Sequence, residues 1–253
     1  MTLQFYYHPL SMPSRSVRLF LKKTGIQVEE IIIDLAKREQ HSPEFLKINP
    51  RHCVPVIVDG DFILTEGIAI LCYLIEKFPD KVADHWYPKD LRKRARVNEY
   101  LSYHDGSTRQ LFSRVFQDEY WFWDKKVTDE ERKNHIKDML YVATQLQDTF
   151  LKDKQYLCGD EISIADLMAI SEVSTVKAFE ADGRILSQWV KLLLNVMATS
   201  QVIQPTIGRP DTTKEHPKLA EWLERVKTFL KPEFDEVYEP FYEVRKEAMS
   251  KKK

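Results

Sequence analysis

The serine best placed for chemistry stands where an aromatic, strand-like run near the N-terminus ends. The run Phe5-Tyr6-Tyr7-His8 stops at Pro9, and a helix start follows at Met12-Pro13, which leaves the hydroxyl of Ser11 at the turn. A helix N-terminus presents unpaired N–H groups and the positive end of the helix dipole, so it favours a bound anion. Ser11 is therefore placed to donate a hydrogen bond to a thiolate. The alternative is that Ser11 is an ordinary helix cap ahead of a proline.

A second unusual feature is a proline inside a strand pattern. The run Val54-Pro55-Val56-Ile57-Val58 reads as a strand, but Pro55 cannot donate a backbone hydrogen bond to a neighbouring strand. A cis peptide bond before Pro55 resolves this conflict. It also leaves the backbone of Val54 free to pair with an extended ligand.

The elements that must position these residues begin with a strand, a helix and a second strand. Residues 3–7 predict a buried strand, and the apolar positions of residues 17–21 predict a helix that Gly25 ends. The β-branched residues 28–33 then predict a strand covered on both faces. Such a βαβ unit almost always has a right-handed crossover.

A short helix and a hairpin complete this first half. Ser42-Pro43-Glu44 has the cap, proline and acid of a helix start, and Asp59-Gly60 is a strong hairpin signal between two strand-like runs. Thr65-Glu66-Gly67 then opens an apolar helix over residues 68–78. This order of elements predicts a thioredoxin-like α/β half.

The remainder of the chain has a helical pattern. A polar connector ends near Pro88, and a long helix follows that is bent or broken near Gly106. Helix caps are expected at Thr128 and at Ser163-Ile164-Ala165-Asp166. Residues 200–215 are rich in turn residues. The aromatic residues 121–123 are expected to be mostly core, and so are the tail aromatics Tyr238, Phe241 and Tyr242. We expect a thioredoxin-like domain over 1–80, a linker over 81–89 and an all-helical domain over 90–253.

Composition excludes several classes of function. The 253 residues carry 38 Lys and Arg against 39 Asp and Glu, so no basic field favours nucleic acid. Seven glycines form no phosphate-binding loop, and three cysteines without a C-x-x-C pattern indicate reduced thiols rather than disulfides or a zinc site. No leader peptide and no membrane-spanning run is apparent. We expect a cytoplasmic protein with no metal, no nucleic acid partner and no membrane partner.

Several motifs in this order resemble those of the cytosolic glutathione transferases. They cover nearly the whole chain and are Ser11-Met12-Pro13-Ser14-Arg15, Asn49-Pro50 with Val54-Pro55, Asp59-Gly60 with Leu64-Thr65-Glu66-Gly67-Ile68-Ala69-Ile70, and Ser163-Ile164-Ala165-Asp166-Leu167. The serine at the first turn, together with Trp86-Tyr87-Pro88 and the residues 94–101, is most similar to the theta class. The long C-terminal part fits that class as well, because its members carry an extra helix over the active site.

The resemblance implies a chemistry that uses glutathione as a cosubstrate, with no other cofactor. The pKa of a free thiol is roughly 8.5, so little of it is thiolate at neutral pH. A hydrogen bond to the ionised form, together with a helix N-terminus, lowers that pKa. Ser11 would be the donor, and the thiolate would attack small apolar electrophiles or an organic hydroperoxide. Ser14 and Ser16 are the neighbouring alternatives for this donor.

The resemblance also assigns the contacts of the tripeptide. The backbone of Val54, before a cis Pro55, would pair with the cysteinyl part of glutathione. Glu66 and the N–H of Gly67 would meet the γ-glutamyl end. Gln40 and His41 lie where theta members place polar or basic groups near the glycyl carboxylate.

One further assignment and two departures concern the charges around the ligand. Arg109 corresponds to an arginine that theta members project from the long helix toward the sulfur. Gly67 stands where the family usually has serine, which removes a hydroxyl worth about 1.5–3 kcal/mol to a charged ligand. Cys53 stands where theta members often have lysine, and Arg51 or His52 are the cations that could take its place. Cys53 is either a redox-sensitive thiol or a small half-buried residue.

Two classes of function follow from these features. The favoured one is a glutathione S-transferase, with glutathione peroxidase activity as an extension. The alternative is a non-catalytic ligand-binding or assembly module on the same fold. Gly67 and Cys53 favour this alternative, and Ser11, Pro55, Glu66 and Arg109 together oppose it. Because family members dimerise through the last helix of the first domain and the long helix after the linker, we expect a homodimer.

Overall fold

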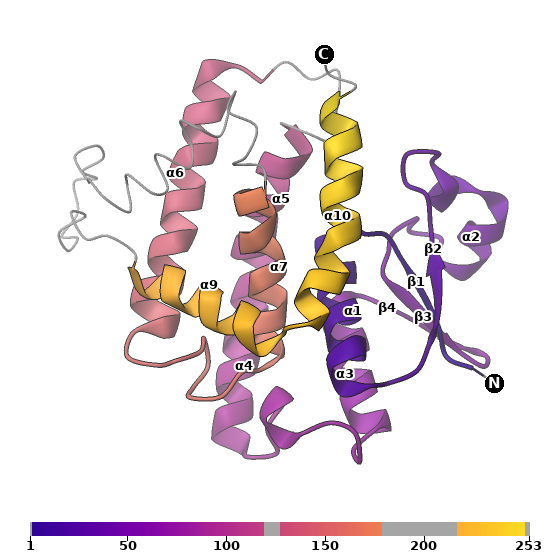
Figure 1. Cartoon of the computed structure of the whole chain (residues 1–253), viewed down its shortest axis with the longest axis horizontal. Helices are drawn as coiled ribbons and strands as arrows, with labels where there is room; N and C mark the ends of the chain where they lie inside the picture. The colour runs from indigo at the N-terminus through magenta and orange to yellow at the C-terminus, as the bar shows by residue number, and fades with distance from the viewer. Residues whose placement is uncertain (1, 119–126, 179–216, 251–253) are drawn as a thin grey trace.

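The computed structural model describes residues 2–118, 127–178 and 217–250 (Figure 1). In chain order its strands and helices are β1 (Gln4–Tyr7), α1 (Met12–Thr24), β2 (Glu29–Ile32), α2 (Pro43–Ile48), β3 (Val56–Asp59), β4 (Phe62–Thr65), α3 (Gly67–Lys77), α4 (Leu91–Tyr103), α5 (Arg109–Phe116), α6 (Asp129–Gln145), α7 (Ile164–Ala178), α9 (Pro217–Phe229) and α10 (Glu233–Ser250). The predicted segments 121–123 and 200–215 lie outside the described residues.

The four strands form one mixed sheet in the order β2-β1-β3-β4. β1 pairs in parallel with β2 and antiparallel with β3, and β4 returns beside β3 through the predicted hairpin. Figure 1 shows α1 and α3 on the face that meets the helical half, with α2 on the opposite face. On that opposite face, Phe45 of α2 packs with Ile33 and Val56 in a small separate cluster. The predicted thioredoxin-like arrangement is confirmed.

The strand predicted over residues 28–33 forms, but the prediction that both its faces are covered is wrong. β2 is an edge strand, and Ile32 keeps 56% of its surface exposed, whereas the sequence pattern predicted a strand covered on both faces. β-Branched residues suit any pleated surface, so their presence does not distinguish an edge strand from a central one. Burial begins just beyond the strand, at Ile33.

The ends of α1 are fixed by local chemistry. The side chain of Ser11 accepts a hydrogen bond from the backbone N–H of Ser14, and Gly25 ends the helix with a φ of 66°. A residue with a Cβ is disfavoured in this left-handed region, which explains the glycine. Both predicted ends of the helix are confirmed.

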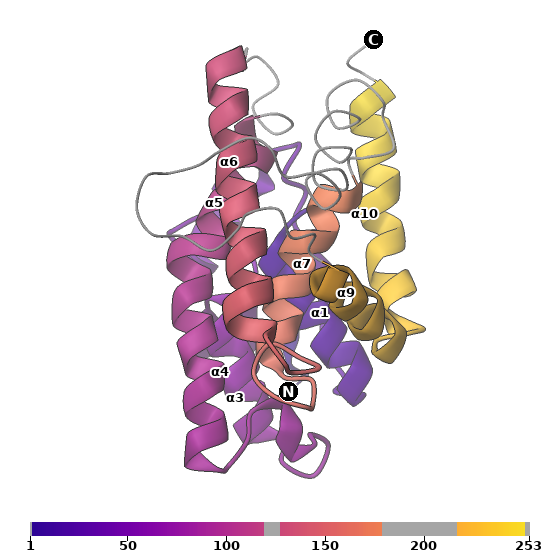
Figure 2. The ribbon, with the colours of Figure 1, turned by 90° about the vertical axis from the view of Figure 1, so that its left-hand side faces the viewer.

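The helices after the connector surround α7. α4 and α5 form one continuous helical rod, and the irregularity predicted near Gly106 is a π-helical turn over His104–Thr108 rather than a break. Figure 2 shows α7 in the middle of this half, with α4, α5 and α6 to one side of it and α10 to the other. α7 also packs against α1, the helix that Ser11 caps. A single large hydrophobic core therefore extends from the sheet into the helices.

Both predicted helix caps in this half are confirmed. Thr128 forms a reciprocal capping box with Glu131 at the start of α6. At the start of α7, the buried carboxylate of Asp166 accepts hydrogen bonds from the backbone N–H and the hydroxyl of Ser163. It also accepts bonds from Leu157 N–H and from the indole of Trp222, which ties α7 to α9.

The tail aromatics lie on α10. Tyr238 and Phe241 are fully buried, whereas Tyr242 is 40% exposed, so the tail aromatics are mostly core, as predicted. None of the helices within the described ranges has the length and apolar character needed to cross a bilayer. Within those same ranges, no cluster of His, Cys, Asp or Glu has an arrangement suited to a metal ion.

Candidate active site

The hydroxyl of Ser11 links the start of α1 to the strand-like segment that precedes β3. Its oxygen accepts a hydrogen bond from the backbone nitrogen of Ser14 at 3.4 Å. The same hydroxyl donates a hydrogen bond to the carbonyl oxygen of Val54 at 3.3 Å. Both distances are at the long end of the range for hydrogen bonds, so the hydroxyl proton is held weakly. Ser11 is half-buried.

The two alternative serines have different surroundings. Ser16 is fully buried and donates to the carbonyl oxygen of Leu167 and the hydroxyl of Ser171, both on α7. Ser14 is also fully buried, with no exposed surface. Neither hydroxyl faces solvent, so Ser11 is the member of this group that a ligand from solution can reach.

The backbone beside Ser11 has the predicted conformation. The peptide bond between Val54 and Pro55 is cis, and Val54 is half-buried. The preceding loop is fixed by Asn49, whose side-chain amide donates to the carbonyl oxygen of Cys53 at 2.8 Å. A stretch of backbone therefore lies beside the N-terminus of α1.

Glu66 stands at the N-terminus of α3 in an unusual conformation. Its φ is 69°, which non-glycine residues adopt rarely and usually at functional positions. Its carboxylate is 70% exposed and lies 3.1 Å from the guanidinium of Arg51. Arg51 also donates to the hydroxyl of Thr65. The guanidinium of Arg51 is therefore already bound to Glu66 and Thr65.

Gly67 is where α3 approaches α1. A Cβ built on Gly67 would lie 3.1 Å from the Cβ of Pro13, which is closer than most real Cβ contacts. The absence of a side chain therefore lets the first turn of α3 lie directly against the first turn of α1. Two helix N-termini meet beside Ser11 as a result, and their unpaired N–H groups favour an anion there.

The remaining residues predicted for the ligand lie in the short turn before α2 and in the loop before Val54. Gln40 and His41 form a 3-10 turn, in which Gln40 is half-buried and His41 is exposed. The ring of His41 lies 4.6 Å from the ring of His52, centroid to centroid. His41, His52 and the exposed thiol of Cys53 thus form one polar surface.

Cys53 is not an activated thiol in these surroundings. Partial burial raises its pKa, and the Glu66 carboxylate raises it further, which outweighs the guanidinium groups of Arg51 and Arg109. Its Sγ contacts the carbonyl oxygen of Arg51 at 3.0 Å. Because the thiolate is the reactive form, Cys53 is a weak nucleophile at neutral pH.

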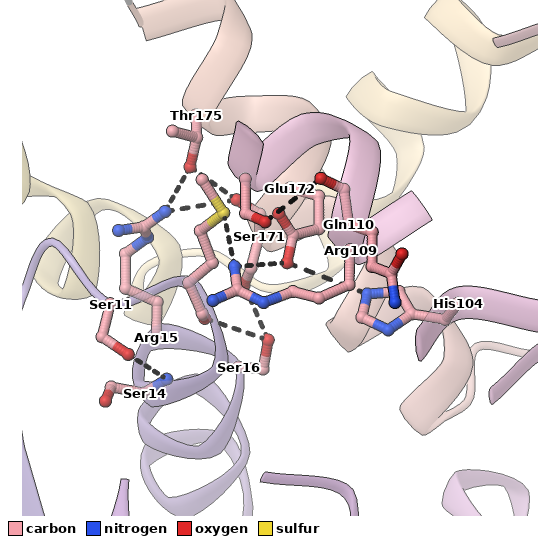
Figure 3. Close-up of polar contacts among 12 residues, drawn as sticks. Ser11, Ser14, Arg15, Ser16, His104, Arg109, Gln110, Ser171, Glu172 and Thr175 are labelled. Carbon is pink, nitrogen blue, oxygen red and sulfur yellow. Dashed lines mark hydrogen bonds and ion pairs between the residues drawn. The ribbon is translucent and has the colours of Figure 1, made fainter. Parts of the chain in front are cut away.

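Arg109 reaches α1 from the first turn of α5. Its Nη1 lies 3.0 Å from the sulfur of Met12 and 3.1 Å from Oε1 of Glu172 (Figure 3). Met12 directly follows Ser11, so the guanidinium lies next to the helix start that Ser11 caps. The Arg109 side chain is 31% exposed, whereas Glu172 is 1% exposed.

The sequence reasoning missed Glu172 and the buried Arg15. Arg15 donates to the carbonyl oxygen of Pro9. It also donates to the carbonyl oxygen of Ser171 and binds the hydroxyl of Thr175 (Figure 3). A signal was available for Glu172, because it is the one charged residue in the stretch of α7 from Leu167 to Val176. Their partners are 63 and 156 residues away in the chain, respectively, which no local pattern reports.

The arrangement can hold an extended, anionic, thiol-bearing ligand. It offers a hydroxyl proton, two helix N-termini, an exposed carboxylate for a cationic group, a stretch of backbone beside Val54 and the guanidinium of Arg109. The helix N-termini and the guanidinium all favour a negative charge near Ser11. Stabilisation of a bound thiolate is the chemistry that this combination supports.

Comparison with known proteins agrees with this arrangement. The family model for the glutathione S-transferase N-terminal domain matches residues 1–76. Rat glutathione S-transferase theta-2 is 33% identical over 260 residues, which covers 99% of this chain and 91% of that protein.

Two solved human structures are similar over nearly the whole chain. Human glutathione transferase theta-2 in complex with glutathione and an unknown ligand has a TM-score of 0.80 at 33% identity, with 98% of this chain and 91% of that chain covered. A human theta-class structure with the glutathione conjugate of 1-menaphthyl sulfate has a TM-score of 0.81 at 33% identity, covering 99% and 91%. The similarity therefore includes both the sheet and the helical half.

Proposed function

The chain belongs to the theta-class glutathione S-transferases, and from that premise we propose that Ser11 stabilises the glutathione thiolate. As a member of this family it is an enzyme that conjugates glutathione to other molecules. The role of Ser11 rests on one observation. Its hydroxyl bridges the first turn of α1 and the carbonyl oxygen of Val54, the residue whose backbone we expect to pair with glutathione.

The mechanism follows from the weak hydrogen bond that Ser11 donates. A neutral carbonyl accepts the proton in the present structure, and a thiolate is a stronger acceptor because it carries a full charge. A glutathione molecule whose backbone pairs with Val54 would have its sulfur within reach of the Ser11 hydroxyl. Each unit by which the bound thiol pKa falls raises the thiolate share almost tenfold until ionisation is complete. Ser11 forms no covalent bond with the substrate.

We further propose the contacts of the two ends of glutathione. Glu66 binds the γ-glutamyl ammonium, and the N–H of Gly67 binds the adjoining carboxylate at the N-terminus of α3. Gln40 and His41 bind the glycyl end. Each proposal is supported by the position of the residue around Val54 and Pro55. Arg109 adds a positive charge beside Ser11.

The same thiolate supports a peroxidase reaction, which we propose as a second activity. The sulfur attacks an oxygen of an organic hydroperoxide, and the O–O bond breaks to release an alcohol. A second glutathione then displaces the hydroxyl from sulfur, which yields glutathione disulfide and water. Small apolar electrophiles and organic hydroperoxides are thus the two cosubstrate classes, and a coupled assay of glutathione disulfide with cumene hydroperoxide tests the second.

We also propose the organisation of the protein in solution. The change from sheet to helices after α3 supports a glutathione-binding domain over 1–80, a linker over 81–89 and a helical domain over 90–253. Exposed apolar side chains on β4 and at the start of α4 support a homodimer, and they are Phe62, Ile63 and Leu91. Three unpaired cysteines support a cytoplasmic location. A mass of one 29.9 kDa chain by light scattering would contradict the dimer.

The role of Ser11 is tested by titrating the ultraviolet absorbance of bound glutathione thiolate. We expect the wild-type complex to titrate well below the free thiol pKa of roughly 8.5, and Ser11→Ala to raise that pKa by about one unit or more. Conjugation at neutral pH falls by about tenfold per unit lost. Ser14→Ala, one turn along and fully buried, is the matched control and leaves the pKa unchanged.

The outcome of this titration also separates catalysis from simple binding. If the wild-type protein binds glutathione with an unshifted thiol pKa, the chain acts as a ligand-binding module. Thermal unfolding of both variants accompanies the titration, because loss of the Ser11 cap alone costs about 0.5–2 kcal/mol of stability.

A further inference from the structure

We propose that Glu172 is a positioning residue that fixes the guanidinium of Arg109 beside Ser11, and thereby keeps a positive charge at the glutathione sulfur. This inference rests on the proposed function of Ser11. Glu172 is too deeply buried to touch the ligand, so it acts through Arg109.

Glu172 contacts the guanidinium group of Arg109 directly. Glu172 lies in the middle of α7 with 1% of its side chain exposed, and its Oε1 lies 3.1 Å from Nη1 of Arg109. The same Nη1 lies 3.0 Å from the sulfur of Met12 (Figure 3). In the described part of the chain, Nη1 is the guanidinium nitrogen with hydrogen-bond partners. The N–H groups on Nε and Nη2 are therefore available to a ligand.

Glu172 has little support other than Arg109. Its second oxygen, Oε2, is buried and has no hydrogen-bond partner among the described residues. The nearest ring nitrogen of His104 lies 3.9 Å from Oε1, and burial together with Arg109 lowers the pKa of His104 to about 3. The imidazole is therefore neutral at physiological pH. Arg15 acts on Glu172 only at longer range, since its own donors bind Pro9 and Ser171.

Because Glu172 has no other close cationic partner among the described residues, its pairing with Arg109 restrains the guanidinium. Burying a carboxylate without its cation is strongly unfavourable, so the guanidinium is held against Glu172 even though Arg109 is 31% exposed. An arginine without such a partner samples solvent-facing rotamers, and its charge near the ligand is then screened by water. Burial raises the pKa of Glu172, and Arg109 opposes that rise. The net shift is upward, so the ion pair with Arg109 is the main interaction that favours the ionised form of this buried carboxylate.

Two physical effects of Glu172 on the thiolate have opposite signs. As a bare negative charge near the sulfur, Glu172 would raise the thiol pKa, and its removal would lower that pKa. As the residue that positions Arg109, Glu172 lowers the thiol pKa, and its removal raises it. The sign of the change on neutralising Glu172 therefore distinguishes positioning from simple repulsion.

The test is the thiolate titration on Glu172→Gln, which removes the charge and keeps the shape. We expect the pKa of bound glutathione to rise by about half a unit to one unit, with kcat/KM for conjugation reduced about threefold to tenfold near pH 6.5. Near pH 9 the two proteins converge, because the thiol is ionised in both. A purely structural role would lower Tm and leave this pH profile in place.

Two controls accompany the variant. Glu30→Gln removes the partner of Arg18, an arginine–glutamate pair of similar length (2.9 Å) on β2 and α1. It leaves the thiol pKa unchanged. Met12→Leu removes the sulfur that contacts Nη1 while keeping an apolar side chain, so it reports the separate contribution of that contact.

A double-mutant cycle with Arg109→Gln shows whether Glu172 acts through Arg109. In the Arg109→Gln background, Glu172→Gln produces no further rise in the thiol pKa. A lowered pKa in both backgrounds, or an unchanged pKa in the wild-type background, overturns the proposal. Glu172→Asp, which retracts the carboxylate by one methylene and keeps its charge, gives a rise of the same sign if Glu172→Gln does not fold.

Failure of this inference and failure of the proposed function give different results. If Ser11→Ala raises the thiol pKa and Glu172→Gln does not, the role of Ser11 stands and the positioning role of Glu172 is rejected. If the wild-type protein itself shows an unshifted thiol pKa, the role of Ser11 fails first, and the positioning role fails with it.

Discussion

The hydroxyl of Ser11 can serve the fold and the chemistry at once. It has two lone pairs and one proton, and in the structure it accepts from the N–H of Ser14 and donates to Val54. When the proton turns to a thiolate, the cap on Ser14 N–H is retained. The interpretation as a helix cap and the interpretation as a thiolate donor are therefore compatible, although the sequence presented them as alternatives.

Gly67 illustrates how one missing side chain affects both packing and binding. In Gly67→Ala, the new Cβ would lie 3.1 Å from the Cβ of Pro13, which belongs to a rigid ring at the start of α1. We expect this overpacking to cost about 1 kcal/mol of stability, measured as a fall in Tm. Gly67→Ser introduces the same Cβ with a hydroxyl, so the two variants share the steric cost.

The comparison of these two variants isolates the hydroxyl. We expect the Gly67→Ser protein to bind glutathione more tightly than the Gly67→Ala protein, by roughly tenfold or more, because a hydrogen bond to a charged carboxylate is worth about 1.5–3 kcal/mol. Isothermal titration calorimetry measures both affinities. Equal affinities would mean that the γ-glutamyl carboxylate lies elsewhere.

At the scale of elements, the contact between α1 and α7 determines the position of Ser11. Arg15 crosses this contact with 1% of its surface exposed, and its guanidinium lies 4.3 Å from the ring centre of Phe241 and 5.1 Å from that of Tyr238 on α10. The planar fork of arginine suits this combination of two carbonyl acceptors and two aromatic faces. Three helices that are distant in sequence are joined at this one side chain.

Arg15→Lys tests the importance of the fork. Lysine keeps the charge but cannot bind Pro9 and Ser171 at once or stack in the same way, so we expect a loss of about 2 kcal/mol or more in unfolding free energy. Lys22→Met is the matched control, because it breaks an exposed pair between α1 and Glu236 of α10. That change costs less than about 1 kcal/mol. Similar losses in chemical denaturation of the two variants would refute this account.

The elements that the sequence predicted correctly are those with local causes. The caps at Ser11 and Thr128, the Asp59-Gly60 hairpin and the irregularity near Gly106 each follow from residues within a few positions. The position of β2 at the edge of the sheet could not be predicted, since the same β-branched residues suit either place.

The candidate site divides in the same way. Ser11, Val54 and Glu66 belong to local motifs, so their positions around one point were predictable from the sequence order of the fold. The pairing of Arg109 with Glu172, and the burial of Arg15, depend on how α7 packs against α1 and α5. Such contacts between remote segments carry no signature in the spacing of residues.

At the scale of the whole molecule, acid sensitivity follows from two buried imidazoles. Burial lowers the pKa of His8 to about 4 and that of His104 to about 3, whereas an unfolded histidine titrates near its ordinary pKa of 6.5. Between these values the unfolded chain binds more protons than the folded one. Stability is therefore full above about pH 6.5 and falls as the pH drops toward 4.

His8→Asn identifies the contribution of one of these groups. The Nδ1 of His8 accepts a hydrogen bond from Leu10 N–H, and an asparagine oxygen can accept the same bond without titrating. We expect the slope of unfolding free energy against pH to decrease by up to about 1.4 kcal/mol per pH unit in this range. Denaturant unfolding at several pH values, without glutathione, measures the slope. An unchanged slope would show that His8 is not buried in its neutral form.

The position of Arg15 has a consequence for the order in which a ribosome makes the protein. Its guanidinium belongs to α1, and the rings that cover it, Tyr238 and Phe241, are synthesised more than 200 residues later. Until then the cation can bind its partners on α7 but lacks its aromatic cover. The N-terminal sheet can pair its strands early, but the surroundings of α1 are complete only when α10 has left the exit tunnel. The environment of the helix that carries Ser11 therefore depends on α10, which is far from it in the sequence.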